Sequence, residues 1–93
     1  MLNPGDVVVI DTGMQFEGYW CDFDRNFIVG GNQYLKEETI KAHELIWEST
    51  EAGFEVAGAK GSTSSDVFRA MVKTLAIDPE TNSTGRMGHG LGL

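Results

Sequence analysis

The chain has 93 residues, of which 41% are hydrophobic and 23% are charged, a composition typical of one small globular domain and too apolar for a disordered segment. Its formal net charge of −7 argues against nucleic acid or an anionic membrane as a partner, because both need a basic face. The single cysteine, Cys21, excludes an intrachain disulfide and favours a cytoplasmic location, and no stretch reaches the ~18 apolar residues of a membrane span.

An antiparallel hairpin is predicted near the N-terminus. Asp6–Thr12 contains four consecutive β-branched residues, a run typical of a buried strand, and Gly13–Phe16 continues it outward. Glu17-Gly18 is the best candidate for a tight turn, after which Tyr19–Val29 returns as a strand rich in aromatic and β-branched residues. A bulge near Gly13 is an open alternative to a regular ladder.

Two helices are predicted after the hairpin. Apolar residues recur at helical spacing from Tyr34 to about Ala57, although Gly53 weakens the second half by about 1 kcal/mol relative to alanine. Ser62–Ser65 offers caps for a second helix that runs to about Ile77. The order of hairpin, helix, helix and loop predicts an α+β arrangement, an antiparallel sheet with helices packed on one face.

The predicted hairpin gathers carboxylates. A turn at Phe16-Glu17 would place Asp11 opposite Asp22, whereas a turn at Glu17-Gly18 would place Asp11 opposite Asp24 with Asp22 on the diagonal. Asp11 and Asp22 share one face in both registers, because strand side chains alternate between faces. A turn centred on Glu17 alone would break this parity.

Like charges opposed on neighbouring strands are destabilising, so the aspartates need an explanation. They can be solvated, share a proton or share a cation, and a divalent metal would resolve the repulsion. The alternative without a metal is also open: aspartates near hairpin ends are often exposed, and Asp24 could pair with Arg25.

His89 is the second candidate ligand. It lies between Gly88 and Gly90, and flanking glycines allow the backbone to approach a ligand or another strand closely. Two aspartates and a neutral imidazole suit Mn, Fe, Co or Zn and favour neither Ca nor Cu. His43 is interpreted as a surface or packing residue within a helix.

Taken together, "IDTGMQFEGYWCDFDRNF", the helical pair and "GHGLG" resemble the pita-bread metallopeptidases: the methionine aminopeptidases, Xaa-Pro aminopeptidases, prolidases and creatinase. Asp11 and Asp22 match that family's pair of aspartates, and His89 matches the histidine of its G-H-G-[IL]-G turn. The D-x-x-R-x-F pattern from Asp22 to Phe27 is most similar to the prolidase and Xaa-Pro aminopeptidase branch.

The resemblance implies a metal-dependent hydrolase that cleaves small peptides near the N-terminus, with a water activated by two divalent ions. Asp11, Asp22 and His89 would supply three of five metal ligands, and the remaining two would be glutamates beyond Leu93. Residues 1–93 are therefore expected to be part of a catalytic domain that lacks its flanking parts. Alone they should bind metal weakly and catalyse little, and the full-length protein is expected to be a homodimer.

One residue departs from the family pattern. Asp24 occupies the place of a threonine that supports the site in the peptidases, so it is a candidate for a supporting role beside the ligands. This departure leaves open an enzyme of the same fold that acts on a small non-peptide substrate, by hydrolysis or elimination. A degenerate family member that serves as a non-catalytic binding module is the other alternative.

Overall fold

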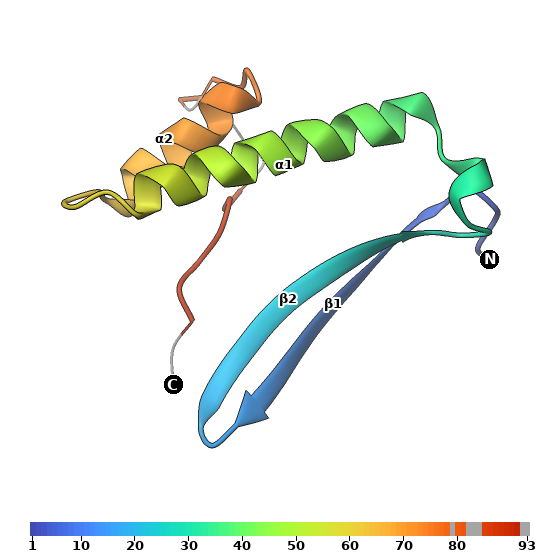
Figure 1. The fold of residues 1–93 in the computed structure, drawn as a ribbon, viewed down its shortest axis with the longest axis horizontal. Helices are drawn as coiled ribbons and strands as arrows, with labels where there is room; N and C mark the ends of the chain where they lie inside the picture. The colour runs from blue at the N-terminus through green and yellow to red at the C-terminus, as the bar shows by residue number, and fades with distance from the viewer. Residues whose placement is uncertain (79, 82–84, 92–93) are drawn as a thin grey trace. The chain divides into compact units, whose positions relative to one another are not determined.

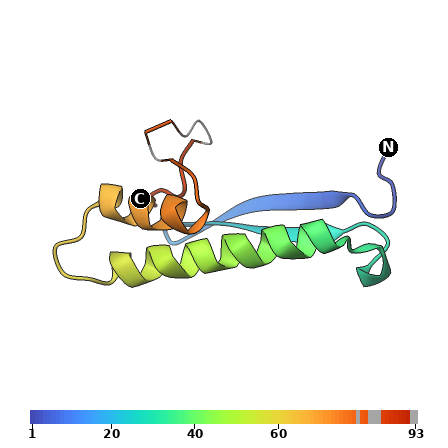
Figure 2. The same ribbon diagram turned by 90° about the horizontal axis from the view of Figure 1, so that it is seen from above.

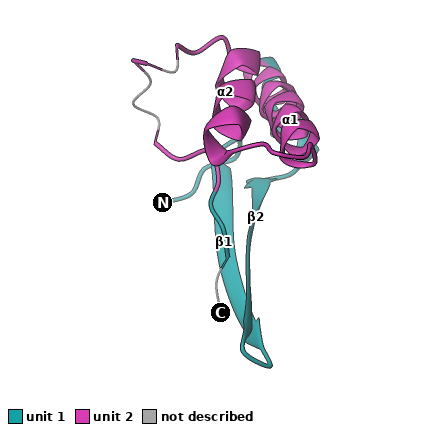
Figure 3. Ribbon diagram, turned by 90° about the vertical axis from the view of Figure 1, so that its left-hand side faces the viewer, with its two compact units in different colours: residues 1–37, 89–93 teal, residues 38–88 magenta. Residues whose placement is uncertain are grey.

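The computed structural model describes residues 1–78, 80–81 and 85–91. The chain divides into two compact units, one formed by residues 1–37 and 89–93 and the other by residues 38–88 (Figure 3). Its elements in chain order (Figure 1) are strands β1 (Val7–Phe16) and β2 (Tyr19–Ile28), a 3-10 turn η1 (Asn32–Tyr34), and helices α1 (Glu37–Ala57) and α2 (Ser64–Thr74). This content confirms the α+β class. None of the helices in the described residues is long and apolar enough to cross a lipid bilayer.

The hairpin is a regular antiparallel ladder. Pairing is unbroken from Val7 opposite Ile28 to Phe16 opposite Tyr19. Glu17 and Gly18 form the two-residue connection with φ of 50° and 89°, the positive pair of a type I′ turn, whose twist matches that of the flanking strands. The predicted turn is therefore confirmed. The alternative of a bulge near Gly13 is wrong, because that residue pairs in register with Asp22.

This register gives the hairpin two unlike faces. The aspartate face consists of Val7, Val9, Asp11, Gly13 and Gln15 on β1 and Trp20, Asp22, Asp24, Asn26 and Ile28 on β2. The apolar face consists of Val8, Ile10, Thr12, Met14 and Phe16 on β1 and Tyr19, Cys21, Phe23, Arg25 and Phe27 on β2.

The apolar face is largely open to solvent in the structure. Phe16 is 72% exposed and Phe23 is 50% exposed. A two-stranded hairpin without a cover is marginally stable in water, because neither face removes enough apolar surface from the solvent. The apolar face therefore requires a cover in the working protein.

Each helix is shorter than predicted from the sequence, the first at its N-terminus and the second at its C-terminus. The first helix begins at Glu37 and not at Tyr34, because residues 32–34 form η1 and Leu35 is extended. The second ends at Thr74, short of Ile77, because Ala76 adopts a left-handed φ of 53°. The backbone N–H groups of Ala76 and Ile77 donate to the carbonyls of Lys73 (3.1 Å) and Val72 (2.9 Å), a Schellman motif that satisfies the last helical carbonyls.

Small residues let α1 and α2 approach closely in the helical unit, where Figures 1 and 2 show the two helices side by side. The Ser49 hydroxyl, buried in the contact, donates a hydrogen bond to the Met71 carbonyl at 3.0 Å. A Cβ atom on Gly53 would lie 2.9 Å from Met71 Cγ. The glycine that weakens the predicted helix is therefore the residue that allows the two helices to pack.

A larger side chain at residue 53 is expected to separate the helices. Gly53→Val should lower the free energy of unfolding by about 1–3 kcal/mol, the usual cost of overpacking a well-packed contact. Glu51→Val is the matched control, because it adds the same β-branched side chain at an exposed position of α1 and should cost about 0.5 kcal/mol or less. Urea denaturation monitored by circular dichroism measures both. An equal loss in the two variants would contradict the proposed close contact.

A capping box begins α2, as the predicted caps suggested. The Asp66 N–H donates to the Thr63 hydroxyl oxygen (3.3 Å), and the Thr63 N–H donates to the Asp66 carboxylate (2.9 Å). The Thr63 hydroxyl also donates to that carboxylate at 2.6 Å. Hydrogen bonds from the Thr63 hydroxyl and then from its backbone lower the pKa of Asp66 below its ordinary value of 3.8, and the nearby Arg69 guanidinium adds to the shift.

The cap is therefore expected to be sensitive to acid. Because folding lowers the pKa of Asp66, its stabilising contribution is complete above pH 3.8 and is lost as pH falls through the lower pKa of the folded state. A carbon-detected NMR titration should find the midpoint of the Asp66 carboxyl below 3.8. Asp66→Asn should remove the part of the acid destabilisation that comes from this group. A midpoint at or above the ordinary value would contradict the capping role.

Candidate metal centre

The hairpin register places three carboxylates on its aspartate face. Asp11 lies directly opposite Asp24, and Gly13, two residues after Asp11, lies opposite Asp22. Of the two registers left open by the sequence, the structure adopts the one set by a turn at Glu17-Gly18. Asp22 is therefore the diagonal neighbour of Asp11, and the predicted shared face is confirmed.

The imidazole of His89 meets one of these carboxylates. Its Nε2 atom lies 3.0 Å from Asp22 Oδ2, and both residues belong to the same compact unit although they are far apart in sequence. The side chains are 45% and 39% exposed, so solvent and dissolved ions can reach them.

The contact of the other ring nitrogen, Nδ1, indicates which nitrogen of a neutral His89 imidazole carries the proton. The Nδ1 atom of His89 lies 3.0 Å from the Gly90 carbonyl oxygen, an atom that only accepts hydrogen bonds. The proton of a neutral ring therefore belongs on Nδ1, and Nε2 turns a lone pair towards the carboxylate of Asp22. Two lone pairs at that distance repel each other unless a proton or a cation lies between them.

A divalent cation fits this pair of donors. Two atoms that are each about 2.1 Å from one ion, at right angles to each other, lie about 3.0 Å apart. The observed separation of Nε2 and Oδ2 is the same. A neutral imidazole and a carboxylate are also the donor types preferred by Mn, Fe, Co and Zn. Asp22 and His89 are therefore two predicted ligands that the structure brings together at a separation compatible with one cation.

The structure does not assemble the complete predicted set. In residues 1–78, 80–81 and 85–91, no three side chains of His, Cys, Asp or Glu lie close enough to hold one ion. Asp22 and His89 come together, while Asp11 shares their hairpin face without joining them. A Cβ atom added at Gly88 or Gly90 would meet open space, so no close backbone approach occurs around His89 among these residues. His43 is exposed on α1, in the other unit.

Arg25 does not neutralise Asp24. Its guanidinium donates to the backbone carbonyl oxygen of Asp24 at 2.5 Å and lies over the Phe23 ring, 5.1 Å from the centroid. Strand alternation explains this choice, because Arg25 projects from the apolar face and the Asp24 side chain from the aspartate face. The alternative of a local ion pair between these two residues is therefore wrong.

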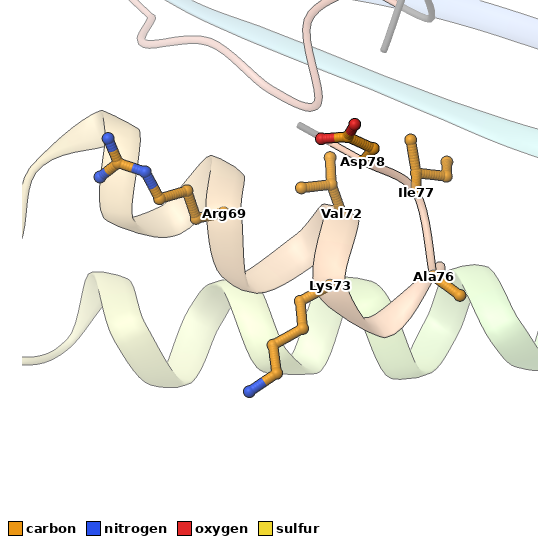
Figure 4. A pocket seen from close by; sticks show the side chains of 6 residues that line it. All are labelled: Arg69, Val72, Lys73, Ala76, Ile77 and Asp78. Atoms are coloured by element: carbon orange, nitrogen blue, oxygen red, sulfur yellow. The ribbon is translucent and has the colours of Figure 1, made fainter. Parts of the chain in front are cut away.

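A hollow at the C-terminal end of α2 is a less suitable site (Figure 4). It is lined by Arg69, Val72, Lys73, Ala76, Ile77 and Asp78. Its carboxylate, Asp78, already accepts a hydrogen bond from the Glu80 N–H at 3.0 Å. The hollow is wide open and lacks histidine or cysteine, so its residues do not suggest metal chemistry.

Comparison with known proteins identifies the family of the chain. The sequence model of metallopeptidase family M24 matches residues 1–93. The chain is 32% identical over 95 aligned positions to a Mycoplasma pneumoniae protein named "Putative Xaa-Pro aminopeptidase", and the match covers 99% of this chain and 26% of that protein. The chain thus spans about a quarter of the length of this relative. No solved structure matches it significantly. The chain belongs to metallopeptidase family M24 and so to the pita-bread fold.

Proposed function

We propose that the complete protein is a metal-dependent aminopeptidase that cleaves small peptides near their N-terminus, with preference for an Xaa-Pro bond. Membership of a metallopeptidase family implies divalent metal ions and a peptide substrate, and the name of the Mycoplasma relative supports the Xaa-Pro preference. The contact between His89 Nε2 and Asp22 Oδ2 is the observation that carries the proposal, because it joins two predicted ligands at a separation suited to one cation.

Asp11, Asp22 and His89 would hold two divalent ions, of Mn, Co, Zn or Fe. Bound there, the ions would supply a water activated for attack on the scissile carbonyl. The two carboxylates would neutralise positive charge from the aspartate face, and the imidazole would add a neutral nitrogen donor. The Gly90 carbonyl contributes by holding the proton on Nδ1, which leaves Nε2 free to bind. Two carboxylates further along the complete chain would finish the site.

We also propose that the complete protein is cytoplasmic and forms a homodimer. A lone, exposed cysteine suits the reducing cytoplasm, and the acidic composition disfavours nucleic acid and anionic membranes as partners. The family resemblance supports a homodimer.

A second candidate is an enzyme of the same fold that acts on a small non-peptide substrate by hydrolysis or elimination. Asp24 favours it, because an extra carboxylate on the aspartate face changes the charge offered to a substrate. Turnover of Xaa-Pro dipeptides would decide between the two candidates.

The complete protein loaded with Mn or Co is expected to hydrolyse Xaa-Pro dipeptides and to lose activity in EDTA. His89→Ala should lower activity at least 100-fold and metal affinity at least tenfold, because loss of a ligand or its orienting shell typically costs that much affinity. The matched control is His43→Ala, an exposed histidine outside the site, which should change neither quantity by more than about twofold.

Tight metal binding without turnover of any Xaa-Pro dipeptide would favour the non-peptide substrate. A wild-type protein that holds no stoichiometric metal would contradict both enzymes and leave the binding module. Metal content by mass spectrometry and hydrolysis by chromatography of the released amino acid provide the two measurements.

A further inference from the structure

We draw no further inference here: the strongest candidate, the exposed apolar stripe that Ile40, Trp47 and Phe54 form along α1, carries nothing because nothing in the part of the chain that the structure describes shows what covers it.

Discussion

The two-residue turn at Glu17-Gly18 determines where every side chain of the hairpin points. A slip of one residue in pairing would move a whole strand's side chains to the opposite face, because the side-chain period of a strand is two. The positive φ angles of these two residues select a turn whose twist suits a tight hairpin. The ladder then runs without interruption to Val7 and Ile28, and three aspartates share one face as a consequence.

His89 brings an imidazole to the negatively charged face of the hairpin. Four of the five aromatic side chains of the hairpin lie on the opposite, apolar face. The imidazole places Nε2 3.0 Å from Asp22 Oδ2, while its Nδ1 atom contacts the Gly90 carbonyl oxygen. Either a proton on Nε2 or a cation shared with Asp22 would make this contact favourable.

Much of the local structure could be predicted because it depends on neighbouring residues. The run of β-branched residues, the Glu17-Gly18 turn and the caps before Asp66 are all short-range signals, and the structure contains each of them. Helix ends were less predictable. The second helix stops where Ala76 turns left-handed, a conformation that alanine rarely adopts and that no local pattern indicated.

Gly53 shows why propensity alone misleads. In an isolated helix glycine is a weak residue, yet here its missing Cβ leaves room for the Met71 side chain of the neighbouring helix. The sequence contains the glycine but not the identity of the residue that packs against it, because that contact joins two separate helices.

The sequence by itself determined the residue types of the candidate site, their spacing along the chain, a small set of possible hairpin turns and the resemblance to the pita-bread metallopeptidases. Only the tertiary structure decided that Asp24 faces Asp11, that His89 meets Asp22, and that Arg25 lies away from Asp24. The physical reason is that short-range signals are compatible with more than one turn, and each turn gives a different register, whereas contacts between distant residues depend on the simultaneous fit of many side chains.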